Sequence, residues 1–88
     1  MSKLTGSDLI IKCLKMYDVD TIFGIAGDHI LHLLDRLIDQ NFRMIDGRHE
    51  SASVHMANAY SRILRKPGVV LSTTPGHANA VAGLANAM

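Results

Sequence analysis

The chain has 88 residues, of which 48% are hydrophobic and 19% charged, and nine basic side chains nearly balance eight acidic ones. A chain of this length forms one small globular unit with a marginal core, which suggests a part of a larger protein. A formal charge of +1 and an aromatic content of 5% provide neither the basic field nor the stacking rings that nucleic acid or an acidic membrane surface requires. We therefore expect neither as a partner.

The first part of the chain predicts two helices that alternate with two strands. Thr5 opens a capping box, and the helix that follows would turn one apolar stripe inward. That stripe comprises Leu9, Ile10, Cys13, Leu14 and Tyr17. Residues 21–25 are β-branched and aromatic without polar alternation, as in a strand covered on both faces. A glycine turn over 24–27 then leads to a second helix opened by Asp28, and residues 43–46 form a second strand. The apolar repeat of the second helix is Ile30, Leu31, Leu34, Leu37 and Ile38.

The second part predicts two further helices around a third strand. Residues 50–64 carry a helical apolar repeat, which the Pro67-Gly68 pair ends. That repeat is Val54, Ala57, Tyr60, Ile63 and Leu64. Residues 68–72 have the composition of the most clearly buried strand in the chain. Pro75-Gly76 leads into an alanine-rich helix that runs to Met88 without a closing cap, as expected of an element cut from a longer protein.

Because every strand is followed by a helix, we expect an α/β fold of three layers, a parallel sheet with flanking helices joined by right-handed crossovers. The first strand would lie between the second and the third. Ligands of such sheets bind beyond the carboxyl ends of the strands. Three turns would meet there, at residues 24–29, 46–50 and 72–79.

The cysteine count and the N-terminus indicate a cytoplasmic protein. Cys13 is the single cysteine, so no disulfide can form within the chain, and its place in an apolar repeat suggests a buried thiol in a reducing compartment. The N-terminus lacks the apolar stretch of a signal peptide, and no apolar run reaches the roughly 18 to 20 residues that span a bilayer.

The sequence contains parts of two known binding motifs, but neither motif is complete. Gly24-x-x-Gly27 followed by Asp46 is part of a dinucleotide-binding fingerprint, yet Ile22 stands where the leading glycine belongs. A Rossmann-like half-domain that binds a dinucleotide is therefore the last-ranked alternative. His49-Glu50 would begin a zinc-protease motif, but a serine occupies the place of the second histidine. We expect no metal site built from this chain's own side chains.

Glu50 follows a strand directly and begins a helix, so it is placed at the crevice where a parallel sheet holds its ligands. The alternative is simple helix-start electrostatics, because an acidic side chain in a first turn stabilises a helix by about 0.3 to 1 kcal/mol. Position alone leaves both interpretations open.

Six blocks in fixed order carry a family resemblance. They are residues 5–8, 19–24, 48–50 (Arg48-His49-Glu50), 57–62, 66–71 and 74–80 (Thr74-Pro75-Gly76-His77-Ala78-Asn79-Ala80). Together they resemble the N-terminal pyrimidine-binding domain of thiamine-diphosphate enzymes, and the pattern is closest to the acetolactate synthase, pyruvate oxidase and benzaldehyde lyase group. The resemblance covers essentially the whole chain.

The resemblance implies a catalytic role for Glu50. In the family, the matching glutamate bonds the ring nitrogen of the aminopyrimidine opposite its exocyclic amine, and so favours the imino tautomer that deprotonates the thiazolium carbon. A desolvated carboxyl with a raised pKa would suit that task. A positioned acid or base of this kind typically contributes about 10²- to 10⁴-fold in rate.

The same resemblance implies further site residues. The expected cofactor-binding residues are Ala26, Gly27, Glu50, Thr73, Pro75 and Asn79. Ala26 replaces the proline of the family's loop near the reacting carbon, which loosens one backbone dihedral, and Thr74 stands where glycine is commoner. His29 matches an imidazole of the substrate pocket and is a candidate for proton transfer; a first-turn histidine facing water is the equal alternative.

The resemblance also implies what lies outside residues 1–88. The family binds diphosphate and Mg²⁺ through a Gly-Asp-Gly motif in a separate C-terminal domain, and nothing here matches that motif. Residues 1–88 would then be the N-terminal portion of the pyrimidine-binding domain, inactive by itself, with the middle and diphosphate-binding domains absent. The parent would be a homodimer or homotetramer that acts on carbon–carbon bonds next to the carbonyl of a 2-oxo acid or aldehyde, and a need for FAD stays open. The alternative from another class is a non-catalytic fragment or interaction module, with the small-residue helix 78–88 as its interface.

Overall fold

The computed structural model describes residues 4–27, 30–73 and 76–88. Helices and strands alternate along the chain in the predicted order. They are α1 (Gly6–Met16), β1 (Thr21–Gly24), α2 (Leu31–Asp39), β2 (Arg43–Asp46), α3 (Glu50–Leu64), β3 (Val69–Leu71) and α4 (Gly76–Ala87). In the described part of the chain, no helix is long and apolar enough to cross a membrane.

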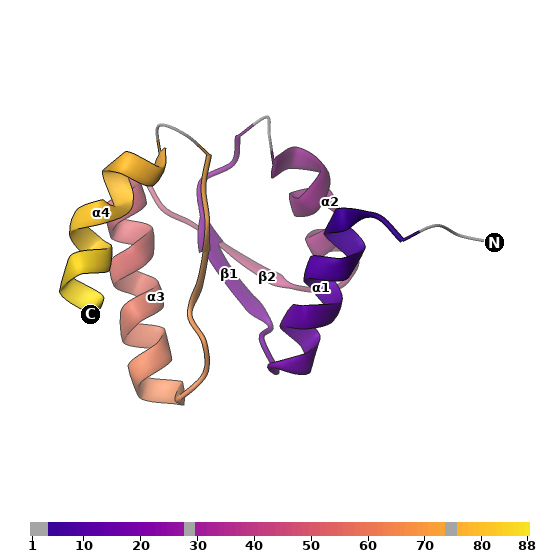
Figure 1. Ribbon diagram of the computed structural model, residues 1–88, viewed down its shortest axis with the longest axis horizontal. Coiled ribbons are helices and arrows are strands. Elements are labelled where there is room, and N and C mark those ends of the chain that lie inside the picture. Colours follow the sequence, from indigo (N-terminus) through magenta and orange to yellow (C-terminus); the bar gives the residue numbers. More distant parts are fainter. Residues whose placement is uncertain (1–3, 28–29, 74–75) are drawn as a thin grey trace.

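The three strands form one parallel sheet in the order β2-β1-β3. On the central strand, Phe23 pairs with Ile45 on one side and with Val70 on the other. α1 and α2 cover one face of the sheet, α3 covers the other, and α4 packs against α3 (Figure 1). The predicted α/β class and the central place of the first strand are therefore confirmed. Because the strands are parallel, their carboxyl ends lie together at one end of the sheet.

A cluster of large buried apolar residues lies on the side of the sheet that α1 and α2 cover, and Val54 and Ala57 of α3 are buried as well. The buried cluster there is Ile11, Val19, Ile22, Leu33, Leu37 and Phe42. Ile22 and Leu37 have no exposed surface at all. Around α3, two glycines allow close approaches. Gly68 lies against the backbone of Ala57, and Gly83 lies against Val54, so neither position has room for a Cβ atom.

The predicted inward stripe of α1 is wrong in its rotation. Ile11 is the buried residue of this helix, whereas Cys13 is an exposed free thiol and Tyr17 is largely exposed. Three polar contacts with α2 and its C-terminal end fix the rotation: Ser7 hydrogen-bonds the ring of His32, Asp8 binds the guanidinium of Arg36, and Lys15 donates to Gln40. An apolar count cannot anticipate such cross-helix pairs.

Two expectations about the sheet and α2 also change. The third strand is only partly buried over Val69–Leu71, because it lies beside β1 at an edge of the sheet, and β1 is the strand that is buried along its whole length. α2 begins after Ile30, whose side chain makes no capping hydrogen bond. Asp28, the expected opening residue, lies outside the described residues.

Candidate functional site

The three predicted turns meet at the end of the sheet formed by the carboxyl ends of its strands. The backbone N–H of Gly47 donates to the carbonyl of Gly24 at 3.1 Å, which joins the second turn to the first. Gly27 lies against the third turn, since a Cβ atom at Gly27 would be 2.8 Å from Oγ1 of Thr73. For the described residues, the convergence expected from the topology is confirmed.

Glu50 and Asn79 form a hydrogen-bonded pair at this end of the sheet. Glu50 is the first residue of α3 and is partly exposed, and Asn79 lies in the first turn of α4. The side-chain amide Nδ2 of Asn79 donates to Oε1 of Glu50 at 3.1 Å. The other oxygen, Oε2, lies against Gly76, where an added Cβ would be 2.8 Å away. The structure thus brings together the two residues, 29 positions apart, that the sequence placed at one ligand.

The start of α3 is fixed by its own cap. His49 has an extended backbone with φ −152°, and its ring Nδ1 accepts the backbone N–H of Ser51 at 3.1 Å. The hydroxyl of Ser51 donates to the backbone carbonyl of Asn79. These bonds set where α3 begins and link its first turn to that of α4.

The surroundings of Glu50 stabilise its charged form. The hydrogen bond from Asn79 lowers the pKa of Glu50 below its ordinary value, and the backbone N–H of Glu50 and the nearby His49 act in the same direction. Burial acts in the opposite direction, but the side chain keeps some contact with solvent. The expectation of a raised pKa is therefore wrong for this chain, because its desolvation is outweighed by a donor from α4.

The remaining predicted site residues are placed unevenly. Ala26 is exposed and lines a hollow of about 620 Å³ together with Ile25 and the turn that follows β2. Gly27 and Thr73 are in contact with each other, as described above. His29 and Pro75 lie outside the described residues.

These residues suit an aminopyrimidine. A ring nitrogen needs a carboxyl partner that can hold a proton, and Glu50 offers Oε2 while Asn79 occupies Oε1. The absence of a Cβ at Gly27 and Gly76 lets the side chains of Thr73 and Glu50 pack directly against the backbone of the turns. The described residues contain no cluster of three His, Cys, Asp or Glu side chains that could hold a metal ion.

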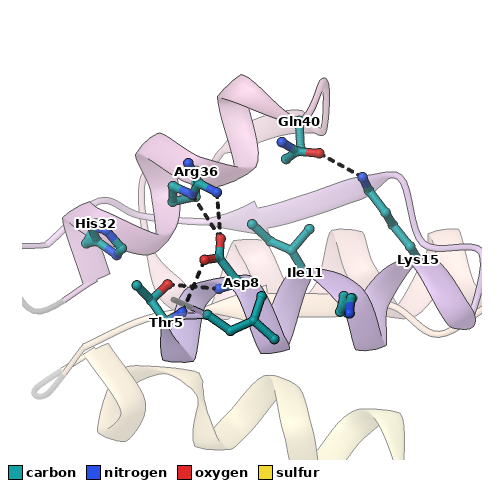
Figure 2. Close-up of a pocket in the computed structure, with 9 residues that line it drawn as sticks. Thr5, Asp8, Ile11, Lys15, His32, Arg36 and Gln40 are labelled. Atoms are coloured by element: carbon teal, nitrogen blue, oxygen red, sulfur yellow. Dashed lines mark hydrogen bonds and ion pairs between the residues drawn. The ribbon is translucent and has the colours of Figure 1, made fainter. Parts of the chain in front are cut away.

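A second hollow lies between α1 and α2 and has a different character (Figure 2). Its polar side chains bind one another across the two helices: Asp8 contacts Arg36 at 2.6 Å, and Lys15 donates to Gln40 at 2.8 Å (Figure 2). Its lining residues come from these helices and the segment before α1, not from the three turns. We regard it as part of the packing between two helices.

Sequence reasoning missed Ser51 and Gly76 as parts of the site. Ser51 is a small polar residue in a helix start, a place where serine is common, and no spacing rule links it to a residue of α4. The sequence predicts Gly76 only as part of a turn. Its significance depends on the side chain of Glu50, which reaches it across the gap between two helices.

The comparisons with known proteins agree on one family. The family model described as "Thiamine pyrophosphate enzyme, N-terminal TPP binding domain" matches residues 4–88. The chain is 42% identical over 83 residues to the catabolic acetolactate synthase of Raoultella terrigena, 41% over 86 residues to the acetolactate synthase of Bacillus subtilis, and 38% over 85 residues to the 2-hydroxyacyl-CoA lyase of Saccharomyces cerevisiae. These matches cover 93%, 97% and 96% of this chain. The chain spans about 15% of the length of each of these relatives.

Proposed function

Because the chain belongs to the family of N-terminal TPP-binding domains of thiamine pyrophosphate enzymes, we propose that it forms the pyrimidine side of a thiamine diphosphate site in an acetolactate-synthase-like enzyme. The observation that carries the proposal is the carboxyl group of Glu50, held by the side-chain amide of Asn79 at the carboxyl end of the sheet, where the three turns meet. Family membership does not favour the dinucleotide-binding or the non-catalytic alternative.

Each residue at the edge has a defined task in this proposal. The charged carboxyl group of Glu50 shares, through Oε2, the proton carried by the pyrimidine ring nitrogen, and Asn79 keeps the carboxyl group oriented through Oε1. Thr73 and the loop at Ala26 and Gly27 enclose the ring and limit the access of water. Thiamine diphosphate, when bound, supplies the carbon nucleophile.

The remaining features of the enzyme are also proposals. His29 and Pro75 belong to the site by family resemblance, His29 for proton transfer and Pro75 for contact with the ring. Residues 1–88 form the N-terminal portion of the pyrimidine-binding domain, and Mg²⁺ and the diphosphate are held by other parts of a longer protein.

The substrate class follows from the chemistry of the group. We propose a 2-oxo acid or an aldehyde, with a carbon–carbon bond made or broken next to the carbonyl. Two relatives are named acetolactate synthases and one a 2-hydroxyacyl-CoA lyase, which supports this class. A cytoplasmic homodimer or homotetramer completes the proposal, and the 88-residue chain alone is expected to be inactive.

The proposal is tested with Glu50→Gln in the complete enzyme that carries this chain. The variant keeps the size of the side chain but cannot hold the proton. We expect hydrogen–deuterium exchange at the thiazolium carbon of the bound cofactor to slow by about 10²- to 10⁴-fold. Asp39→Asn, which neutralises an exposed carboxylate at the end of α2, is the control and leaves the exchange rate unchanged. An unchanged rate in Glu50→Gln would remove Glu50 from cofactor activation.

A further inference from the structure

We infer that Ser51 is a positioning residue for Glu50: its hydroxyl ties the first turn of α4 to that of α3, so that the amide of Asn79 stays on one oxygen of the carboxyl group and leaves the other for a ligand. The reference to a ligand rests on the function proposed above. The positioning itself rests on contacts between described residues alone.

Two hydrogen bonds hold Asn79, one at its backbone carbonyl and one at its side-chain amide. Ser51 donates to the backbone carbonyl of Asn79, and the side-chain amide of the same asparagine donates to Glu50. Ser51 is itself held, because its backbone N–H is bound by the ring of His49. The chain of contacts therefore runs from the cap of α3, through the backbone of α4, to the carboxyl group.

The other contacts named between α3 and α4 are apolar and therefore less directional than a hydrogen bond. Further along, Gly83 packs against the side chain of Val54, and buried Ala80 adds another small apolar surface. Such contacts hold helices together but tolerate sliding by a fraction of a turn, because dispersion is weakly directional. A hydrogen bond from Ser51 to a single carbonyl fixes the register of the two helices.

This register decides which carboxyl oxygen is offered. With Asn79 on Oε1, the remaining oxygen Oε2 lies beside Gly76, where the absent Cβ leaves room. Without the Ser51 hydroxyl, the first turn of α4 can shift and Asn79 can leave the carboxyl group. Glu50 would then rotate freely between its two oxygens.

The composition of the chain offers a direct test, because Glu50 is its only glutamate. Glutamate labelled with ¹³C at the side-chain carboxyl gives a single titrating signal that needs no assignment and no cofactor. Four variants of the 88-residue chain are compared with the wild type: Ser51→Ala, Ser51→Thr, Asn79→Ala and Ser61→Ala. Asp46, Arg48 and His49, which lie close to Glu50 in the sequence, and His77, in the first turn of α4, stay unchanged in all of them.

We expect Asn79→Ala to raise the pKa of Glu50, since the donor that lowers it is lost. Ser51→Ala raises it as well, although Ser51 donates no side-chain hydrogen bond to Glu50. Ser51→Thr, which restores a hydroxyl, keeps the wild-type titration. Ser61→Ala, on the same helix and ten positions away, keeps it too. Circular dichroism verifies that the variants retain their helices, so a raised pKa does not reflect unfolding.

A titration of Ser51→Ala that matches the wild type, beside a raised pKa in Asn79→Ala, would overturn the role of Ser51. A wild-type signal at the ordinary value for glutamate, or an unchanged pKa in Asn79→Ala, would overturn it by removing the contact between Asn79 and Glu50. If the shifts occur but Glu50→Gln activates the cofactor normally, the positioning stands and the proposed function fails. The two ideas therefore fail separately.

Discussion

At the scale of single residues, the site depends on close approaches that only glycine permits. Gly76 is buried at the start of α4, and the carboxyl group of Glu50 occupies the space where its Cβ would be. Gly6 also starts a helix, but a Cβ there would meet nothing within 4 Å. Alanine substitutions at Gly76 and at Gly6 therefore separate the effect of a Cβ on the site from its effect on the start of a helix.

We predict that Gly76→Ala lowers the cofactor-dependent kcat/KM of the complete enzyme at least about tenfold, which corresponds to roughly 1.4 kcal/mol of transition-state stabilisation. The new Cβ would lie 2.8 Å from Oε2 and 3.0 Å from Cγ of Glu50, so the carboxyl group must move. Because the atoms that the new Cβ meets belong to a side chain, which can yield more easily than backbone, the free energy of unfolding should fall by only about 1 kcal/mol, the low end of the usual cost of overpacking.

Gly6→Ala is the matched control and should leave kcat/KM unchanged. Urea unfolding of both variants measures the change in the free energy of unfolding. A Gly76→Ala enzyme with wild-type kcat/KM would show that the position of Oε2 has no bearing on activity.

At this same scale, the sequence predicted where Glu50 lies but not its protonation. The strand-to-helix transition at Glu50 is visible in the local pattern, so its place at the edge of the sheet could be inferred. The direction of its pKa depends on Asn79, a donor 29 positions away that reaches Glu50 only through the packing of α3 against α4. Local pattern carries no information about such a contact.

At the scale of elements, one carboxylate contributes both to the start of α1 and to its contact with α2. Asp8 accepts the backbone N–H of Thr5 within the capping box of α1, and it also accepts two hydrogen bonds from Arg36 of α2 (Figure 2). The bond from the Thr5 backbone and those from Arg36 lower the pKa of Asp8 below its ordinary value. The charged form therefore stabilises both the helix start and the contact between the two helices.

This carboxylate predicts a pH-dependent effect of Asp8→Asn. Since the pKa of Asp8 is lower in the folded than in the unfolded chain, its contribution to stability is complete above the unfolded value of about 3.9. It is lost as the pH falls through the folded value. Asp8→Asn should therefore lower the urea midpoint at pH 7, and the difference from wild type should vanish in strong acid.

Urea unfolding followed by circular dichroism at a series of pH values measures this difference. Asp35→Asn, which removes an exposed carboxylate of α2, is the control and should shift the midpoint little at pH 7. A difference for Asp8→Asn that stays constant from pH 7 into strong acid would contradict the role of its charge.

Elements differed in how well the sequence predicted them. The capping box at Thr5 and the apolar run of β1 are local signals, and both were predicted correctly. The degree of burial of β3 was not, because Val69–Leu71 has the composition of a central strand but lies at an edge of the sheet. Position within a sheet is a property of the whole fold, and a three-residue run does not encode it.

At the scale of the whole molecule, the topology followed from connectivity. Parallel strands joined by helices allow few arrangements, and the order β2-β1-β3 is the one expected. What the apolar pattern could not show is which side chains stay outside. Several large apolar residues are exposed in the described part of the chain, among them Ile63 at 79% and Met88 at 101%. The apolar content therefore overstates the size of the core.

A core this small depends strongly on its central residues. Ile22 lies in the middle strand with no exposed surface and belongs to the cluster packed between the sheet and α1–α2. We predict that Ile22→Ala lowers the free energy of unfolding by about 2 to 5 kcal/mol, whereas Ile22→Val, which removes one methylene group, costs about 0.5 to 1.5 kcal/mol. The larger loss is comparable with the whole stability of a small domain, about 5 to 15 kcal/mol.

Ile63→Ala is the matched control, because it makes the same substitution at a site that is 79% exposed. It should change the free energy of unfolding by less than about 0.5 kcal/mol. Urea unfolding of the 88-residue chain, followed by circular dichroism, ranks the three variants. If Ile63→Ala proved as costly as Ile22→Ala, the stabilising core would not be the one between the sheet and the two N-terminal helices. A ranking of Ile22→Ala, then Ile22→Val, then Ile63→Ala locates the stability of the chain at the centre of its sheet.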